Sequence, residues 1–376
     1  MTRRTGTVGV GVIGTGMISD AYLRNLVRFP DLDVLALGDL DESRAAAQGD
    51  AYGVRSAGSP KLVLDHPDIE IVVNLTVPAA HADVSAAALA AGKNVWVEKP
   101  ISVDRVSARA LLEQAAAAGL RIGVAPDTVL GAGVQTARKA ILRGDIGVPV
   151  AAQTTMQYAG PELFHPNPSF LYARGAGPLF DMGPYYLSAL VGLLGPVDSV
   201  SAVGARARES RSVIVGDAAG SSFPVEVPTH VAAIAKFERG PLGQSFFSFD
   251  SPISRVGVVE ITGTEGTLVV SDPNKFTGDV RIGRIAPGAD DETEPVWERV
   301  PLVGVDTGRG LGVLDLARAI RNDRPHIASG ELGYHVLDAL SAIDEAVLSG
   351  SWTPVESTVA EVPLMPDDFD PFAPTL

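Results

Sequence analysis

Asn94-Val95-Trp96-Val97-Glu98-Lys99-Pro100 is the stretch from which the fold of this chain can be read. Its apolar run predicts a short buried strand, and an acid, a lysine and a proline follow that run without a spacer. Open parallel sheets bind ligands just outside the carboxyl ends of their strands. The stretch therefore predicts a strand of a parallel sheet, with Glu98 and Lys99 at the edge where a ligand would bind.

Strands and helices alternate on both sides of this stretch. Further apolar runs predict strands at residues 7–13, 34–38, 69–75 and 120–125, with helical patterns between them. Such alternation is typical of an α/β domain whose parallel strands are joined by right-handed crossovers. We therefore expect a doubly wound parallel sheet of the Rossmann type in residues 1–126.

The first predicted strand runs directly into a glycine-rich turn, Gly14-Thr15-Gly16-Met17-Ile18-Ser19. A turn of this kind between a strand and a helix presents backbone N–H groups to a pyrophosphate, and Gly16 has no side chain to block that approach. Ser19 stands where the dinucleotide fingerprint has its third glycine, so the turn alone is also compatible with a simple tight turn. In its context the turn predicts a dinucleotide site formed by Gly14, Thr15, Gly16, Met17 and Ile18.

An acid, Asp39, follows the second predicted strand, 25 residues after Gly14. This is near the spacing at which a carboxylate meets the adenosine ribose of a dinucleotide. A carboxylate there accepts hydrogen bonds from the ribose hydroxyls and repels a 2'-phosphate, which favours NAD over NADP. Arg44 is close enough to keep NADP open, and a solvated strand end is the alternative for Asp39.

Composition narrows the other possibilities. The chain has 376 residues, of which 46% are hydrophobic and 20% charged, as in an ordinary globular protein with room for two domains. It has no cysteine, which excludes thiol chemistry and cysteine-bound metals and fits a cytoplasmic protein. A net charge of −15 opposes nucleic-acid binding, no run reaches the roughly 18 apolar residues of a membrane span, and the six histidines are too scattered to predict a metal site.

The alternation stops after Asp127. Strand-like runs then occur at residues 148–158, 199–205, 229–237, 245–250, 256–263, 267–271 and 279–285, followed by helical patterns at 311–322 and 331–348. We expect a C-terminal α+β domain, residues 127–376, that contains a large and mainly antiparallel sheet.

Asp181 and Tyr185 stand out between the first two of these runs. They are four residues apart, so they share a face if one helix carries both. Pro184 would either kink a helix that begins at Pro178 or start a new helix near Gly183, and in both cases the two side chains remain neighbours. The alternative for Tyr185 is a core aromatic residue.

The glycine turn, Thr76-Val77-Pro78 with His81, and Glu98-Lys99-Pro100 have the order and spacing found in the glucose-fructose oxidoreductase, inositol dehydrogenase and rhizopine catabolism (Gfo/Idh/MocA) family. The chain resembles that family over nearly its whole length. The resemblance places Lys99 beside the nicotinamide and the reacting hydroxyl or carbonyl, and it makes Asp181 and Tyr185 the acid-base partners of that lysine. Tyr185 stands where the family most often has histidine. The residues that the resemblance assigns to the cofactor after these strands are Thr76, Pro78, His81, Glu98 and Lys99.

The resemblance also implies a function and an assembly. It implies an NAD(P)-dependent oxidoreductase acting on a sugar, polyol or related cyclic alcohol, in which His165, on a proline-bearing loop, would bind a substrate hydroxyl unless it is simply exposed. Two alternatives are an enzyme that uses bound NAD transiently for sugar elimination or glycoside cleavage, and a non-enzymatic regulator that binds a dinucleotide. The outer face of the large sheet needs a cover, so a homodimer or homotetramer is expected.

Overall fold

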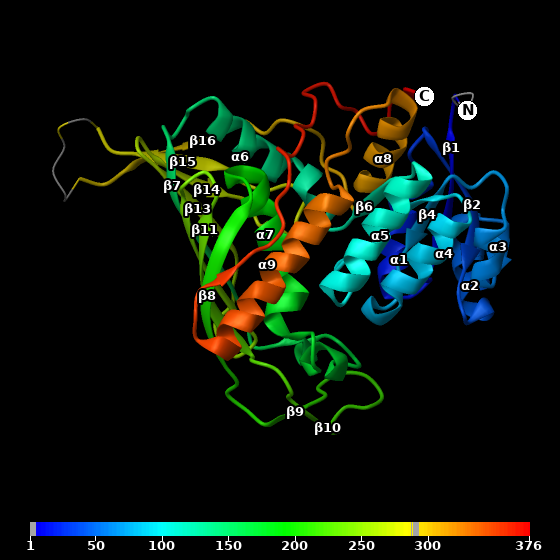
Figure 1. Ribbon diagram of the computed structural model, residues 1–376, viewed down its shortest axis with the longest axis horizontal. Coiled ribbons are helices and arrows are strands. Elements are labelled where there is room, and N and C mark those ends of the chain that lie inside the picture. Colours follow the sequence, from blue (N-terminus) through cyan, green and yellow to red (C-terminus); the bar gives the residue numbers. More distant parts are fainter. Residues whose placement is uncertain (1–4, 287, 289–292) are drawn as a thin grey trace. The chain divides into compact units, whose positions relative to one another are not determined.

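The computed structural model describes residues 5–286, 288 and 293–376, and the chain forms two compact units (Figure 1). The first unit extends to Ala132 and also takes in Gly304–Leu337 and Val362–Leu376, while the second comprises Gly133–Val303 and Asp338–Glu361. The chain first passes from the first unit to the second between Ala132 and Gly133. The return of two later segments to the first unit is a feature that the sequence did not predict.

The described part of the first unit contains a six-stranded parallel sheet, in the order β3-β2-β1-β4-β5-β6. Its strands are β1 (Val8–Ile13), β2 (Leu32–Gly38), β3 (Ser56–Gly58), β4 (Ile71–Asn74), β5 (Asn94–Val97) and β6 (Ile122–Val124). The strand order reverses between β1 and β4, which is the point where sheets of this kind bind their ligands. The predicted doubly wound parallel sheet is confirmed. The sequence did not predict β3, because this strand is only 3 residues long.

Helices connect these strands. They are α1 (Met17–Leu26), α2 (Glu42–Tyr52), α3 (Pro60–Leu64), α4 (His81–Ala90) and α5 (Arg105–Ala118), with short 3-10 turns η1 (Pro78–Ala80) and η2 (Asp127–Leu130). Side-chain caps on Asp41 and Asp104 begin α2 and α5, and left-handed glycines, Gly53 and Gly119, end them.

Trp96 explains why a late helix, α8 (Leu311–Asn322), joins the first unit. Its side chain lies fully buried on β5. A Cβ atom on Gly123 of β6 would come within 2.5 Å of the indole, and one on Gly312 of α8 would overlap it. The two glycines leave the volume that this large ring fills, so α8 covers a part of the parallel sheet that would otherwise expose a tryptophan.

Within the described residues, the second unit is built on a nine-stranded sheet, in the order β16-β15-β14-β13-β7-β12-β11-β8-β17. Its strands are β7 (Pro149–Gln157), β8 (Val197–Ala205), β11 (His230–Phe237), β12 (Leu242–Ser248), β13 (Arg255–Gly263), β14 (Thr267–Val270), β15 (Arg281–Arg284), β16 (Val296–Arg299) and β17 (Thr353–Pro354). Only β7 and β12 pair in parallel there. The predicted large, mainly antiparallel sheet is confirmed, with that one parallel pair as an addition.

Among the described residues, one face of this larger sheet is packed and the other is more exposed. Along β11 the buried residues Val231, Ala233, Ala235 and Phe237 alternate with more exposed ones, as expected for a sheet with one packed face. Helix α7 (Gly177–Leu194) packs on β7, β11 and β12. The remaining elements are α6 (Ala132–Leu142), α9 (Gly330–Ser349), the turns η3 (Pro161–Leu163) and η4 (Ser169–Tyr172), and a separate hairpin of β9 (Ser210–Ser212) and β10 (Ser222–Pro224).

No helix in the part of the chain that the structure describes is long and apolar enough to cross a membrane.

Candidate active site

The glycine turn lies at the carboxyl end of β1, next to the point where the strand order reverses. Gly14 has a φ of +96°, and a Cβ atom there would come within 2.7 Å of the Leu75 backbone after β4, so only glycine allows these two strand ends to approach so closely. Gly16 begins α1 without a side-chain cap, and open space surrounds the position that its Cβ would take. Gly16 therefore places no side chain in the way of a phosphate group that approaches the first N–H groups of α1.

Asp39 braces this turn from the end of β2. Its Oδ2 accepts hydrogen bonds from the backbone N–H and the hydroxyl of Thr15, at 2.7 and 2.9 Å. Its Oδ1 accepts from the backbone N–H of Asp41 at 2.9 Å and from the guanidinium of Arg44 at 3.0 Å. Burial works to raise the pKa of Asp39, but these hydrogen bonds and the charge of Arg44 hold it below its ordinary value. An ionised acid thus fixes Thr15 at the predicted cofactor site.

Glu98 is tied to helix α1. The carboxylate is buried, its Oε1 accepts a hydrogen bond from the hydroxyl of Tyr22 at 2.8 Å, and its Oε2 accepts from the backbone N–H of Lys99 at 3.0 Å. The indole N–H of Trp96 in turn donates to the Tyr22 hydroxyl at 3.2 Å. Burial, followed by the charge of Glu98, raises the pKa of Tyr22 well above its usual value, so that hydroxyl stays protonated as a donor. Glu98 thereby holds the backbone of Lys99 in place. Lys99 is half-buried, and the peptide bond between it and Pro100 is cis.

His81 lies behind the loops that follow β4 and β5. It is 1% exposed, with its Nδ1 2.6 Å from the carbonyl oxygen of Pro100 and its Nε2 3.0 Å from that of Thr76. Burial lowers the pKa of His81, although the two carbonyl groups work against that shift. Pro78 begins η1 just before this histidine. His81 therefore connects the two loops that carry Thr76 and Lys99, and its own ring is covered.

Asp127 is a residue whose part in this region the sequence did not reveal. It is fully buried after β6, and its carboxylate accepts from Arg309 at 3.2 Å and from the backbone N–H of Gly310 at 2.8 Å. Burial raises the pKa of Asp127, and the charge of Arg309 opposes the rise. The acid fixes the start of α8. Its position after a predicted strand was the only signal, and nothing in the sequence pointed to a partner so far along the chain.

Asp181 and Tyr185 lie on one helix, α7, which contains Pro184 in its interior. This decides between the two arrangements that the sequence left open, because the helix begins at Gly177 and continues through the proline. Four residues apart, the two side chains share a helical face. Tyr185 is 7% exposed and Asp181 is partly exposed.

Tyr158, which directly follows β7, is a further residue that the charge of Asp181 affects. Burial raises its pKa, and the negative charge of Asp181 adds to the rise, so the phenol lies within electrostatic reach of that acid. The Tyr158 ring stacks on Phe164, with centroids 6.2 Å apart, and meets the edge of Phe249 at 5.2 Å. The only feature of the sequence that could have pointed to Tyr158 is its position as an aromatic residue at the end of a predicted strand.

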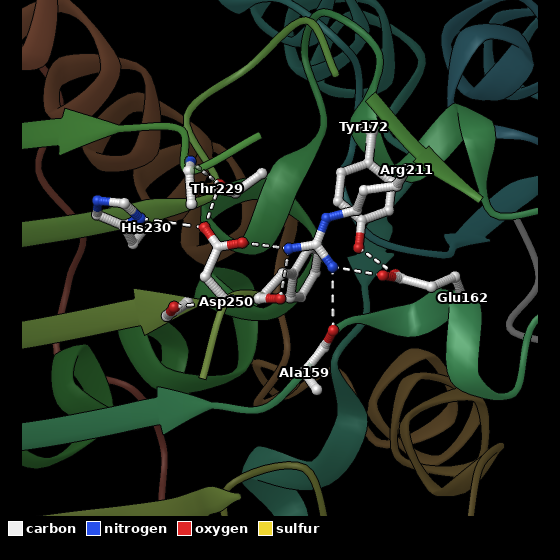
Figure 2. A network of polar contacts seen from close by, with 10 residues as sticks. Ala159, Glu162, Tyr172, Arg211, Thr229, His230 and Asp250 are labelled. Carbon is white, nitrogen blue, oxygen red and sulfur yellow. Dashed lines mark hydrogen bonds and ion pairs between the residues drawn. The ribbon is translucent and has the colours of Figure 1, made fainter. Parts of the chain in front are cut away.

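His165 lies on the loop that follows β7. Its Nδ1 accepts from the backbone N–H of Asn167 at 3.0 Å, and its ring packs edge-on against Phe170 at 5.3 Å. The ring is partly exposed, so the structure leaves both the substrate-binding and the surface interpretation of His165 in place. Ala159, Glu162 and Tyr172 of the same loop belong to a network of polar residues centred on Arg211 (Figure 2).

Among residues 5–286, 288 and 293–376, no group of three or more histidines and acids is arranged to hold a metal ion.

A parallel sheet with a glycine turn and a braced acid at its switch point, followed by a second unit on a mixed sheet, defines the chain as an NAD-binding oxidoreductase. It belongs to the Gfo/Idh/MocA family. Residues 8–125 match the family described as "Oxidoreductase family, NAD-binding Rossmann fold", and residues 134–269 match the "GFO/IDH/MocA C-terminal domain". Together the two matches cover more than half of the chain.

Relatives and solved structures agree with this assignment. Inositol 2-dehydrogenase 3 of Saccharopolyspora erythraea is 32% identical over 42% of this chain, and the match spans 48% of that relative. Myo-inositol 2-dehydrogenase of Thermotoga maritima is 23% identical over 71% of this chain and 76% of its own length. The crystal structure of an NAD binding oxidoreductase from Klebsiella pneumoniae is 27% identical, with a TM-score of 0.79 over 93% of this chain and 99% of that one. Levoglucosan dehydrogenase in complex with NADH and L-sorbose, at 22% identity, shares the fold with a TM-score of 0.81 over 93% and 99% of the two chains.

Proposed function

We propose that this protein interconverts a hydroxyl and a carbonyl on a sugar, polyol or related cyclic alcohol, with NAD as its cofactor. The observation that carries the proposal is the convergence of the glycine turn, Asp39 and the Glu98-Lys99 pair at the carboxyl edge of one parallel sheet. The substrate class is supported by the names of two relatives, which are inositol dehydrogenases.

The residues of the first unit fit NAD. The open space at Gly16 and the uncapped start of α1 suit the pyrophosphate, which Thr15, Met17 and Ile18 would also meet. Asp39 would face the adenosine ribose, and because it is ionised and already pairs with Arg44, it disfavours the 2'-phosphate of NADP. When bound, NAD supplies the hydride acceptor at C4 of the nicotinamide. Thr76, Pro78 and the Glu98-Lys99 pair would contact its nicotinamide half, with His81 acting through the loops that it joins.

Three side chains would move the proton. Tyr185 would take the proton of the substrate hydroxyl, Asp181 on the same helical face would orient the tyrosine, and the charge of Lys99 would stabilise the developing alkoxide. A positive charge in a partly desolvated site favours a developing anion more strongly than it does in water. Reduction of a carbonyl would use the same groups in reverse.

A substrate screen tests the proposal. Sugars, polyols and cyclic alcohols are offered with NAD and with NADP, and nicotinamide absorbance is followed. We expect at least one cyclic alcohol to give NADH in step with its own loss, with NAD preferred. Product without net NADH would instead support the elimination or glycoside-cleavage alternative, and dinucleotide binding without turnover of any compound would support a regulatory protein.

We also propose that the outer face of the larger sheet joins copies of this chain into a homodimer or homotetramer. Ile234 on β11 is 51% exposed on that face. Val203 and Leu242, which are 70% and 51% exposed, pair with Ala232 and Lys236, two residues to either side of Ile234. All of these point the same way because strands repeat every two residues. Sedimentation should show an oligomer that Ile234→Lys dissociates, and a monomeric parent protein would contradict this.

A cytoplasmic location of the protein stays a prediction.

A further inference from the structure

Arg211 is a buried arginine that holds four partners at once (Figure 2). It comes from β9, and its side chain is 2% exposed. Nη1 donates to the carbonyl oxygen of Ala159 at 3.0 Å and pairs with the Glu162 carboxylate, while Nη2 donates to the carbonyl oxygen of Phe249 at 2.8 Å and pairs with Asp250. A planar guanidinium can satisfy several acceptors in fixed directions, which an ammonium group cannot do.

These partners belong to the ends of two neighbouring strands. Ala159 and Glu162 follow β7, whereas Phe249 and Asp250 follow β12, and β7 and β12 are the parallel pair of the larger sheet. Their carboxyl ends therefore lie at the same edge. Arg211 ties both ends to the β9–β10 hairpin at that edge.

The far end of the loop after β7 is held as well. We call residues 159–172 the β7 loop. The hydroxyl of Tyr172 donates to Glu162, and the Arg211 guanidinium lies 5.1 Å from the centre of the Tyr172 ring. Gly160 has a φ of +112°, and a Cβ atom there would overlap Glu162, Tyr172 and Arg211. The loop thus starts and ends on one cluster.

A buried group of charges of this kind is weak evidence for added stability. Removing two carboxylates and a guanidinium from water costs free energy that their mutual attraction offsets only when the geometry is well defined. The other carboxylate oxygen of Asp250 accepts a hydrogen bond from the hydroxyl of Thr229 and lies 3.1 Å from Nδ1 of His230. The cluster therefore suits a role in fixing where the β7 loop runs.

The β7 loop and the residue just before it present aromatic surface. Tyr158 immediately precedes it and Phe164 lies within it, and their rings are stacked at an interplanar angle of 26°. Phe164 is 66% exposed, so a large part of its ring is open to contact with a ligand. Tyr158 is anchored from below by Phe249, the residue whose carbonyl Arg211 holds.

We propose that Tyr158 and Phe164 form an aromatic platform for the apolar face of a cyclic sugar or polyol, and that Arg211 is the positioning residue that holds this platform beside Asp181. The inference rests on the proposed function and deepens it, because it explains how a ring would be preferred over an open chain. The C–H groups on one face of the ring pack on the aromatic rings, and the hydroxyl groups at its rim meet Asp181 and the phenol of Tyr158. That phenol stays protonated, because burial and Asp181 raise its pKa, so it donates a hydrogen bond.

The test compares myo-inositol and levoglucosan with D-glucitol, an open-chain polyol that has the carbons and hydroxyls of myo-inositol without its ring. Their dissociation constants are measured by calorimetry on protein saturated with NADH, together with turnover in the presence of NAD. The parent protein should bind at least one cyclic probe more tightly than D-glucitol. Phe164→Leu should weaken binding of that probe about three- to tenfold and leave D-glucitol unchanged, since the lost contact is that of an aromatic face.

Arg211→Lys keeps the positive charge but loses the planar guanidinium that binds several acceptors at once. The control is Arg208→Lys, the same change at an exposed position of the same segment. Arg211→Lys should raise the dissociation constant of the cyclic probe as Phe164→Leu does, with NADH affinity unchanged, and Arg208→Lys should change neither. If Arg211→Lys fails to fold, Tyr172→Phe, which removes one hydroxyl from the same cluster, should show the same selective loss.

Each outcome bears on a different claim. Turnover of a cyclic alcohol with a ring preference that survives Phe164→Leu and Arg211→Lys would overturn the platform and leave the proposed function standing. Binding of a cyclic probe that depends on Phe164, without turnover of any alcohol, would support the platform and overturn the function. An Arg211→Lys protein that melts earlier and binds all probes and NADH equally poorly would reduce Arg211 to a structural residue. Absence of binding by every probe would overturn both proposals.

Discussion

At the scale of single residues, the buried carboxylates of Asp39 and Glu98 at the predicted cofactor site are both held by hydrogen-bond donors, and neither is poised as a free base. Asp39 accepts hydrogen bonds from Thr15, Asp41 and Arg44, and Glu98 accepts them from Tyr22 and the backbone of Lys99. A carboxylate satisfied in this way fixes the groups that donate to it. Both acids therefore act on the predicted cofactor site by holding its loops in place.

Tyr22 is the residue through which Glu98 is held. Tyr22→Phe keeps the ring but leaves one oxygen of a buried carboxylate without its donor, which should cost about 1.5–3 kcal/mol of unfolding free energy. Glu98 also accepts a hydrogen bond from the backbone N–H of Lys99, so a displaced Glu98 would displace Lys99. The kcat of the variant should therefore fall while its affinity for NADH is retained. Urea unfolding and NADH titration measure the two effects. Tyr52→Phe, which loses a bond to the exposed Asp20, is the control and should change neither. A Tyr22→Phe protein with normal kcat would show that the position of Lys99 does not depend on Glu98.

Asp39 makes a prediction about cofactor choice and about pH. Asp39→Asn removes the charge that opposes a 2'-phosphate and releases Arg44, so the ratio of NADP to NAD affinity should rise. Because its pKa is lowered on folding, Asp39 contributes stability above its unfolded pKa of about 3.9, and this contribution is lost as the pH falls through the folded value. The gap in unfolding free energy between the parent and the variant should be full at neutral pH and shrink in acid. A gap that grows in acid, or a parent protein that prefers NADP, would contradict this account of Asp39.

At the scale of elements, contacts between helices and strands decide which segments join which unit. Helix α8 is far from β5 in the sequence, and it belongs to the first unit because Gly123 and Gly312 make room for Trp96. In α7, Gly183 plays a similar part, since a Cβ atom there would come within 2.6 Å of the Leu340 side chain. Glycines inside these elements therefore mark where another element packs closely.

Matched glycine substitutions test this interpretation. Gly312→Ala drives a methyl group into the Trp96 indole and should cost about 1–3 kcal/mol of unfolding free energy, as overpacking does. Gly192→Ala on α7, where nothing lies within 4 Å of the new methyl, should stabilise the protein by about 0.4–1 kcal/mol through the unfolded chain. Thermal and urea unfolding of both variants give the signs. A neutral Gly312→Ala would mean that α8 does not pack on Trp96 as closely as described.

At the scale of the whole molecule, the sequence predicted both sheets because their strands carry strong apolar patterns. Val95 to Val97 and the run from Val8 to Ile13 are continuous apolar strands, and β11 alternates as a half-buried strand should. Asp181 and Tyr185 could be assigned to one face from their spacing alone.

What escaped prediction depends on partners distant in the sequence. Asp127 binds the start of α8, Tyr22 binds Glu98, and Arg211 joins two strand ends to a short hairpin. Local periodicity carries no information about such pairs. The burial of the His81 ring could not be predicted for the same reason. Nothing near His81 in the sequence shows that its ring lies between two carbonyl groups.

The central proposal is that Lys99 and Tyr185 act on the same substrate hydroxyl. A double-mutant cycle of Lys99→Ala and Tyr185→Phe, measured as kcat/KM for the alcohol found in the screen, tests it most directly. Each single change should lower kcat/KM by orders of magnitude while NADH still binds, and the double variant should be little worse than the poorer single one, because groups that act as a unit are strongly non-additive. Losses that simply multiply, or full turnover after either change, would contradict the claim.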